Sequence, residues 1–129
     1  MGNPPKVLIV DDETGVRLLL ELVFREEGYQ VAVAANGMEA LQKVRSFQPD
    51  VVVMDIKMPV MDGLETLPRI KALSPPTKVV IITAYLEAAT IKQVWERGAS
   101  EFLYKPFDIM DIKMTVRRLV EEKGQAYGT

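Results

Sequence analysis

The sequence predicts an α/β protein in which a five-stranded parallel sheet lies between two layers of helices. Three observations predict this three-layer sandwich. Short apolar, β-branched runs alternate five times with longer segments of helical period. The short runs are apolar throughout rather than at every second position, as in strands that are buried on both sides. The length of 129 residues, with 48% apolar content, suffices for one domain. Strands that are apolar on both sides indicate a parallel sheet covered by helices on both faces, which is a doubly wound sheet with right-handed crossovers.

The first half of the chain contains two strand and helix pairs. Val7–Val10 is a continuous apolar run, and Thr14–Glu27 follows it with apolar residues at helical spacing. A weaker run at Val31–Ala34 predicts the second strand, and Gly37–Phe47 the second helix. The apolar stripes consist of Val16, Leu19, Leu20, Val23 and Phe24 in the first helix and of Met38, Ala40, Leu41 and Val44 in the second.

Three further strands and helices complete the pattern. Pro68 lies inside the third helix, where its missing N–H predicts a kink or a late start. Asp108 is placed to cap the last helix, with Asp111 at its third position. We expect a domain at residues 6–122 between tails at 1–5 and 123–129. The remaining elements are expected at Val51–Met54, Leu64–Leu73, Val79–Ile82, Glu87–Arg97 and Phe102–Tyr104, followed by the helix after Asp108.

Composition excludes several classes of function. The net charge of −2 comes from interleaved acids and bases without a basic stripe, so nucleic acid is not an expected partner. The sequence has no cysteine, no apolar run of membrane-spanning length and no charged leader, which predicts a cytoplasmic protein that does not bind membranes. It has no histidine either, so any phosphohistidine must belong to another protein.

Chemistry-bearing residues follow the apolar runs. Asp11 and Asp12 follow the first run, Asp55 the third, Thr83 the fourth and Lys105 the fifth. In an open α/β sheet, ligands bind beyond the carboxyl ends of the strands, so these side chains are expected to meet. Three converging carboxylates repel one another unless a cation lies between them, and oxygen ligands alone favour Mg²⁺ or Mn²⁺.

This set suits phosphoryl transfer. Asp55 is placed to be the nucleophile, because an aspartate can take a phosphoryl group directly. The Lys105 ammonium and the Thr83 hydroxyl would each contact one phosphoryl oxygen. Taken singly, strand-end Asp and Thr residues are also common helix caps, and Lys-Pro is common in turns. All five at consecutive strand ends favour the chemical interpretation.

The motifs around these residues resemble the response regulator receiver family across nearly the whole chain. The resemblance implies a flavodoxin-like strand order of 2-1-3-4-5, phosphorylation of Asp55 and a cis Lys105-Pro106 bond. It also implies metal binding by Asp12 and Asp55, with help from Asp11 and the backbone carbonyl of Lys57. The motifs are Val10-Asp11-Asp12, Met54-Asp55-Ile56-Lys57-Met58-Pro59 with Asp62-Gly63, Ile82-Thr83-Ala84 and Lys105-Pro106-Phe107.

Within the family, the chain is most similar to the single-domain sporulation initiation phosphotransferase F subgroup. The stretch from Val10 to Leu41, Lys57 and Tyr85 carry this similarity. It implies a phosphorelay intermediate that receives its phosphoryl group from a sensor histidine kinase and passes it to a histidine phosphotransferase protein. The chain departs from the subgroup at Phe102, where the subgroup carries histidine. Such a carrier catalyses its own phosphorylation and is expected to be a monomer.

Two surfaces are candidates for partner contacts and switching. Leu18 and Leu22 lie off the core stripe of the first helix, beside Gly15, and predict a docking surface that Tyr85, Pro106 and Phe107 border. Thr83 and Phe102 form a candidate switch, in which Thr83 turns toward the phosphoryl group and Phe102 fills the space. Isolated surface leucines and a simple core role for Phe102 are the competing interpretations.

Three other functions compete with the relay carrier. The chain could be a single-domain effector that binds a target protein through its fourth helix, fifth strand and fifth helix when phosphorylated. It could be the excised receiver of a longer regulator. A Mg²⁺-dependent phosphatase is less favoured, because such enzymes place a second aspartate two residues after the nucleophile and this chain has Lys57 there.

Overall fold

The computed structural model describes residues 2–84 and 87–128, with side chains described as far as residue 122. Five strands alternate with five helices along this part of the chain, which confirms the predicted order of elements. The elements are β1 (Lys6–Val10), α1 (Thr14–Glu26), β2 (Gln30–Ala34), α2 (Gly37–Phe47), β3 (Val51–Asp55), α3 (Gly63–Leu73), β4 (Lys78–Thr83), α4 (Ala88–Glu96), β5 (Glu101–Tyr104) and α5 (Ile109–Gly128).

The strands form one parallel sheet in the order β2-β1-β3-β4-β5, which confirms the doubly wound topology. β1 and β3 are neighbours, and Val10 pairs with Met54 in their register. The residues that follow this pair, Asp11 and Asp55, therefore emerge side by side at the carboxyl end of the sheet. β4 and β5 continue the sheet, with Thr83 paired to Tyr104.

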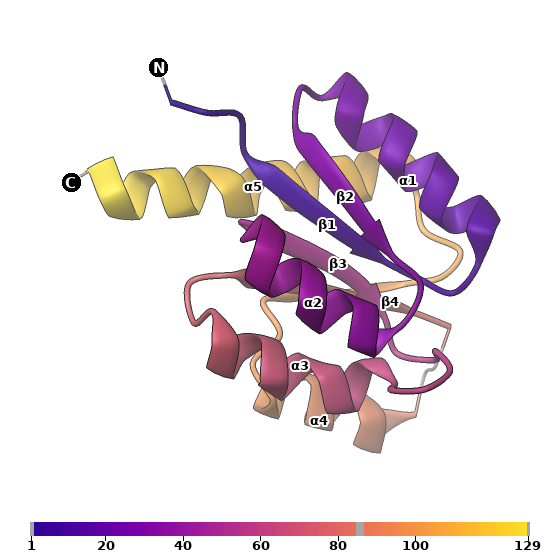
Figure 1. Cartoon of the computed structure of the whole chain (residues 1–129). Coiled ribbons are helices and arrows are strands. Elements are labelled where there is room, and N and C mark those ends of the chain that lie inside the picture. The colour runs from indigo at the N-terminus through magenta and orange to yellow at the C-terminus, as the bar shows by residue number, and fades with distance from the viewer. Residues whose placement is uncertain (1, 85–86, 129) are drawn as a thin grey trace.

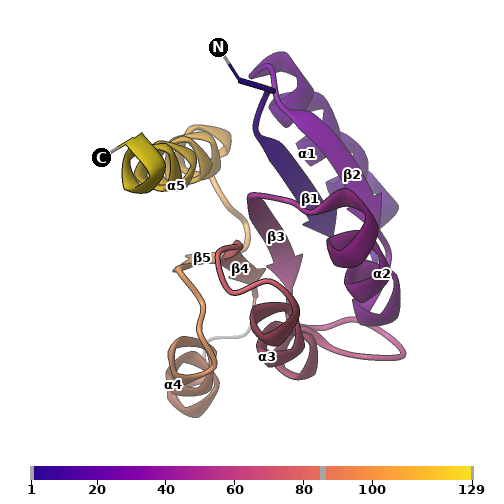
Figure 2. The same cartoon turned by 60° about the vertical axis from the view of Figure 1, so that its left-hand side comes forward.

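Helices cover both faces of the sheet, and a separate core lies on each face. Figures 1 and 2 show α1 and α5 on one face and α2, α3 and α4 on the other. The first core joins Phe24 of α1 and Ile112 of α5 to the sheet, and the second joins Leu41 of α2, Leu67 of α3 and Val94 of α4 to its opposite face. β3 is buried along its whole length, as its continuous apolar run predicts.

Side-chain caps fix where three of the helices begin. The Asn36 side chain accepts a hydrogen bond from the Glu39 N–H at 2.9 Å, while the Glu39 carboxylate accepts one from the Ala35 N–H at 3.1 Å. This reciprocal pair satisfies two backbone donors at the start of α2. Asp62 and Asp108 accept N–H groups of the first turns of α3 and α5 at 2.8 and 2.7 Å. The predicted cap at Asp108 is confirmed.

Two residues of the predicted apolar stripes are exposed instead. Leu19 of α1 is 44% exposed and Met38 of α2 is 47% exposed. The other residues of the α1 stripe, such as Leu20 and Phe24, pack into the core as predicted. The face of each helix that the sheet covers is narrower than the stripe of apolar residues on that helix. Leu19 and Met38 lie at the uncovered margin of their stripes.

α3 begins at Gly63 and runs through Pro68, so the late start that we expected as the alternative to a kink is wrong. Proline supplies no N–H to the carbonyl four residues earlier, which belongs to Leu64. That carbonyl accepts a hydrogen bond from the Arg97 guanidinium, at the end of α4, at 2.6 Å. A side chain of the neighbouring helix therefore replaces the helical bond that Pro68 cannot make.

α5 is longer than the sequence indicates. It continues to Gly128, although we expected residues 123–129 to form a tail. Among the residues described, no helix has both the length and the apolar character needed to cross a membrane.

Candidate functional site

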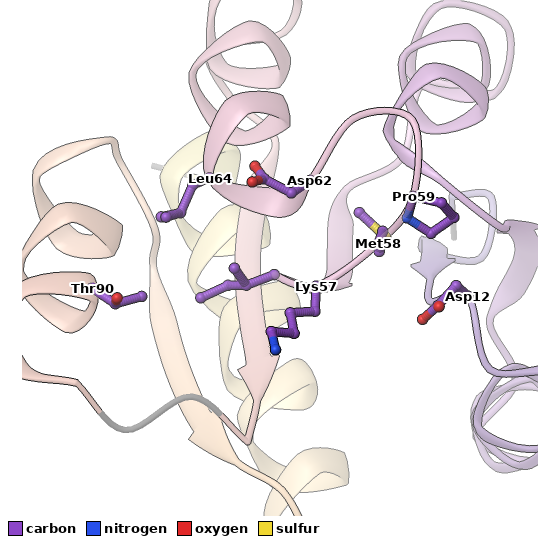
Figure 3. Close-up of a pocket in the computed structure, with 8 residues that line it drawn as sticks. Asp12, Lys57, Met58, Pro59, Asp62, Leu64 and Thr90 are labelled. Carbon is purple, nitrogen blue, oxygen red and sulfur yellow. The ribbon is translucent and has the colours of Figure 1, made fainter.

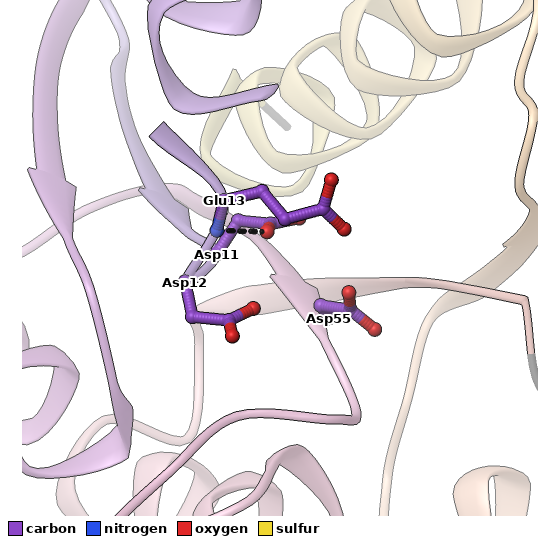
Figure 4. Close-up of side chains that lie close together, drawn as sticks. All are labelled: Asp11, Asp12, Glu13 and Asp55. Carbon is purple, nitrogen blue, oxygen red and sulfur yellow. Dashed lines mark hydrogen bonds between the residues drawn. The ribbon is translucent and has the colours of Figure 1, made fainter. Parts of the chain in front are cut away.

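Four carboxylates gather at the carboxyl end of β1 and β3. Asp11, Asp12 and Glu13 follow β1, and Asp55 ends β3. Each offers an oxygen that lies within 4.8 Å of the oxygens of the other three. Figure 4 shows the four side chains around one small space, with Asp55 reaching in from the neighbouring strand. The sequence predicts three of these residues, and the structure adds Glu13.

Lys105 supplies a positive charge at the centre of this cluster. Its Nζ donates hydrogen bonds to Asp55 Oδ2 at 2.7 Å and to Asp11 Oδ2 at 2.9 Å, and it lies 3.4 Å from Glu13 Oε1. Burial alone would lower the pKa of Lys105, but the hydrogen bonds to Asp55 and Asp11 outweigh it and raise this pKa above its ordinary value. Lys105 therefore stays positively charged beside Asp55 and Asp11.

Asp11 is the most enclosed member of the cluster and has no exposed surface. Burial raises the pKa of its carboxyl group, while the Glu13 N–H and the Lys105 ammonium partly counteract this rise. The Glu13 N–H donates to Asp11 Oδ1 at 2.9 Å, and the Arg17 guanidinium donates to the Asp11 carbonyl at 2.6 Å. These bonds fix the turn from β1 into α1, and with it the carboxylates of the turn.

A cavity of about 270 Å³ opens above the cluster. Asp55, Thr83 and Lys105 all contribute to its wall, together with Asp12 and Lys57. The Lys57 N–H donates to Asp55 Oδ1 at 3.3 Å, so both Asp55 oxygens are engaged. The structure thus brings the phosphoacceptor candidate together with both residues that we expected to contact a phosphoryl group.

The peptide bond between Lys105 and Pro106 is cis, as the resemblance implies. The Lys105 N–H donates to the Thr83 carbonyl at 2.9 Å, which ties the loop after β5 to the end of β4. Lys105 and Thr83 therefore share a backbone connection as well as a cavity.

Gly63 lets α3 begin directly against the end of β3. Its N–H donates to the Ile56 carbonyl at 2.7 Å. A Cβ at this position would lie 2.4 Å from the Asp55 carbonyl oxygen and 2.8 Å from Ile56 Cα. No side chain fits there, so the Asp-Gly pair that starts α3 also sets the position of the Asp55 backbone.

The loop between β3 and α3 borders a second, larger cavity of about 600 Å³. Figure 3 shows Pro59 beside Asp12 on one side of this cavity, with Leu64 and Thr90 on the other. Lys57 belongs to the walls of both cavities, so the two are adjacent.

Comparison with known proteins assigns the family. Residues 7–117 match the model of the family described as the response regulator receiver domain. The chain belongs to this family. The matched segment runs from β1 into α5 and contains every member of the carboxylate cluster as well as Thr83 and Lys105.

Several relatives of this receiver domain share most of its length. It is 46% identical to the sporulation initiation phosphotransferase F of Bacillus subtilis over 92% of this chain and 96% of that one. A receiver domain protein from Methanospirillum hungatei superposes with a TM-score of 0.92, at 28% identity and over 95% and 98% of the two chains. Longer regulatory proteins match as well, among them AtoC of Escherichia coli and ZraR of Klebsiella oxytoca, and the chain spans about a quarter of their length.

A solved complex contains a relative with ligands bound. It is a CheX–CheY–BeF₃–Mg²⁺ complex from Borrelia burgdorferi, which matches with a TM-score of 0.86 at 33% identity over 92% of this chain and 91% of that one. The acidic cluster of our receiver domain is of the kind typical of the magnesium site of this family. Its ligand atoms are all carboxylate oxygens, which suit a hard divalent cation.

The predicted docking residues of the receiver domain take different positions. Leu18 and Leu22 are exposed on α1, in agreement with their placement off the core stripe. Gly15 and Pro106 are exposed as well, whereas Phe107 is partly buried against the core between the sheet and helices α1 and α5. Tyr85 lies outside the described residues. Their role in docking stays a prediction.

The two candidate switch residues of the receiver domain lie on neighbouring strands. Thr83 is buried at the end of β4, and Phe102 is partly buried in β5, where it packs on the core. The Phe102 ring meets the Tyr104 ring edge to face, with 5.0 Å between centroids. Phe102 thus has the core contact that the competing interpretation assigns to it, and switching stays a prediction.

Sequence reasoning missed Glu13 as a member of the cluster. Its signal was present, since Glu13 directly follows the two strand-end aspartates. Its side chain is exposed, and it can approach Lys105 only because α1 starts immediately afterwards and turns the chain back over the sheet.

Proposed function

We propose that this receiver domain accepts a phosphoryl group on Asp55 from the phosphohistidine of a sensor histidine kinase. The contact that carries this proposal is the pair of hydrogen bonds from Lys105 to Asp55 and Asp11, at the floor of a cavity that Thr83 also lines. A nucleophile, a fixed cation and a hydroxyl thus surround one space large enough for a phosphoryl group.

The transfer exchanges one bond to phosphorus for another. An Asp55 carboxylate oxygen forms a bond to phosphorus while the bond from phosphorus to the donor's imidazole nitrogen breaks, and that nitrogen keeps the electron pair. Lys105 leaves its hydrogen bond to Asp55 and donates to a phosphoryl oxygen instead. Thr83 donates its hydroxyl hydrogen to another oxygen. Proton donors from this chain thus neutralise the charge that builds up on the transferring group.

Mg²⁺ or Mn²⁺ is the cation that we propose for the carboxylate cluster. Asp12 and Asp55 would hold it directly, helped by Asp11 and the Lys57 carbonyl, and the four carboxylates provide only oxygen ligands. When bound, the cation supplies positive charge to phosphoryl oxygens that Lys105 and Thr83 do not reach. With four carboxylates and one lysine, the cluster has an excess of negative charge that suits a divalent cation.

We further propose that the chain is a phosphorelay intermediate, which passes the phosphoryl group to a histidine phosphotransferase protein. Two observations support this step. A relative named sporulation initiation phosphotransferase F matches over nearly the full length of both chains, and exposed Leu18 and Leu22 lie on α1, which begins at the carboxylate cluster. Sporulation as the process served rests on this relative alone.

A single-domain effector is the second candidate. Trp95 of α4 and Tyr104 of β5 are large and exposed, and aromatic side chains of this kind anchor protein interfaces. An effector would use this surface to bind its target after phosphorylation. Onward transfer to a histidine separates the two functions, because an effector has no need of it.

Intact-mass measurement tests the phosphorylation. The wild type, incubated with Mg²⁺ and a small acyl phosphate, is expected to gain one phosphoryl group, and a chelator should prevent the gain. Asp55→Asn should gain none. Asp62→Asn is a matched control, because Asp62 caps α3 next to the site and asparagine caps as well as aspartate. Equal labelling of Asp55→Asn and the wild type would refute the proposal.

A further inference from the structure

Val60 has an unusual conformation in the loop between β3 and α3. Its φ angle is +71°, in the left-handed region that β-branched residues almost never adopt. The Met61 N–H donates to the Pro59 carbonyl at 2.8 Å, so Val60 is the central residue of a three-residue γ-turn with positive φ. That turn is rare and strained for any side chain and worst for a β-branched one.

The Val60 side chain gains no compensating burial. It is 79% exposed, although valine is ordinarily a core residue. Its neighbour Met61 is buried in the core, and the Met61 carbonyl accepts the Gly37 N–H at 3.2 Å. The buried Met61 side chain and the hydrogen bond to its carbonyl therefore hold the turn in place, while the isopropyl group of Val60 projects into solvent. Glycine would adopt the same φ without strain.

The turn borders the mouth of the phosphorylation site, which is the larger cavity that shares Asp12 and Lys57 with the site. Pro59, next to Val60, lines the 600 Å³ cavity together with Asp12 and Lys57 (Figure 3). The start of α1, with the exposed Leu18, lies at the same end of the sheet (Figure 1). A protein that brings a phosphohistidine to Asp55 approaches this end of the sheet, where the exposed Val60 side chain is available for contact.

We propose that Val60 is a contact residue for the histidine-bearing partner, and that its isopropyl group packs against an apolar side chain of that protein next to the phosphohistidine. This inference rests on the proposed function. A strained residue persists where its side chain has a use, and an exposed apolar group at the mouth has no use within the fold. The contact adds to the α1 surface and would help to select the partner.

Two variants separate the apolar contact from the strain. Val60→Thr keeps the β-branch, and therefore the strain, but replaces a methyl group by a hydroxyl. Val60→Gly removes both the side chain and the strain. Leu73→Ala is a matched control, because Leu73 is an exposed apolar residue at the end of α3, away from the carboxylate cluster.

The experiment measures two phosphorylation rates and one stability. The donor proteins are purified phosphohistidine proteins, of which the one that labels the wild type fastest is used throughout. Both Val60 variants are expected to slow labelling by this donor at least about fivefold, the loss of one well-placed apolar contact. Labelling by a small acyl phosphate should be unchanged in both. Val60→Gly should raise the unfolding midpoint by a few degrees, and Val60→Thr should leave it near the wild type.

Each remaining outcome has a distinct meaning. Wild-type rates for both variants with the protein donor would overturn the proposal. A slow Val60→Gly with a normal Val60→Thr would also overturn it, because the strained turn rather than the apolar contact would then be responsible. Failure of the wild type to react with the small acyl phosphate would instead refute the phosphorylation of Asp55 itself.

Discussion

Gly63 is the residue on which the position of Asp55 depends most directly. Any Cβ at this position would collide with backbone atoms of residues 55 and 56, which cannot move aside as a flexible side chain can. The position of the Asp55 backbone at the end of β3 therefore depends on the absence of a side chain at residue 63. In the sequence, Gly63 is recognised only as part of a motif. The distances from a Cβ at this position to the backbone of residues 55 and 56 explain why glycine is required there.

We expect Gly63→Ala to destabilise the fold by about 1–3 kcal/mol, because α3 must shift away from the end of β3. The same shift should slow phosphorylation of Asp55 by a small acyl phosphate. Urea unfolding and intact mass are the two measurements. Gly15→Ala is the control, since nothing lies within 4 Å of a Cβ there, and it should be neutral or slightly stabilising. Equal stability of the two variants would contradict the steric argument.

Most of the carboxylate cluster could be predicted residue by residue. The rule that ligands bind beyond strand ends locates Asp11, Asp55 and Lys105, because those residues directly follow apolar runs. The rule says nothing about the residue that directly precedes the next helix, so it missed Glu13. Nor could it find the strain at Val60, because φ is set by the hydrogen bonds that hold the turn and not by the valine itself.

Helices α3 and α4 are joined by a hydrogen bond that replaces one missing within α3. Pro68 leaves the Leu64 carbonyl without its helical partner, and Arg97 provides the substitute. Val94 is the one fully buried residue of α4, and the bond from Arg97 adds a direct link between the end of this helix and α3. The proline and the arginine lie 29 positions apart, and their relation becomes visible only when the two helices are packed side by side.

A double-mutant cycle tests the exchange. Arg97→Ala should cost about 0.5–1.5 kcal/mol, the usual net contribution of a hydrogen bond. In a Pro68→Ala background, residue 68 donates its own N–H to Leu64, so the same Arg97→Ala change should cost clearly less. Arg69→Ala, which removes an exposed i, i+4 ion pair of α3, is a control that should have the same small effect in both backgrounds. Strict additivity for Arg97 and Pro68 would show that they are independent.

The sequence predicts the elements well and their ends less well. Apolar runs place every strand, and most boundaries agree within one residue, because turns and caps interrupt the periodicity at those points. α5 is the exception. Gly124 and the polar residues around it indicate a tail, yet the helix continues through them. Leu19 and Met38 show a second limit of prediction from the sequence. Helical spacing identifies an apolar stripe, but it does not tell how many residues of the stripe the sheet covers.

The first and last helices of the domain, α1 and α5, are linked by ion pairs. Glu27, at the end of α1, accepts a hydrogen bond from Arg117 at 2.6 Å and lies 3.5 Å from Lys113, both on α5. The hydrogen bond from Arg117 holds the pKa of Glu27 below its ordinary value of 4.5. The link therefore stabilises the fold above that pH, and the stabilisation is lost as the pH falls through the lowered value.

Glu27→Gln should therefore reduce stability at neutral pH but much less in acid. The reduction is expected to stay below about 1 kcal/mol, since Arg117 is half exposed and water screens the pair. Urea unfolding at pH 7 and at the lowest pH at which both proteins still fold measures the difference between variant and wild type. Glu26→Gln, a change at the exposed neighbouring carboxylate, should show a smaller difference at both values. A Glu27 effect that is as large in acid as at neutral pH would contradict the assigned role.

The single tryptophan of the sequence, Trp95, is on α4 and 47% exposed. Its indole is therefore an intrinsic optical probe of one helix, in which Val94 is the fully buried residue. Emission wavelength and quenching by iodide would follow the detachment of α4, while far-ultraviolet circular dichroism averages over all five helices. The two signals need not change together during unfolding, and any separation between them would reveal α4 leaving a domain that is otherwise still folded.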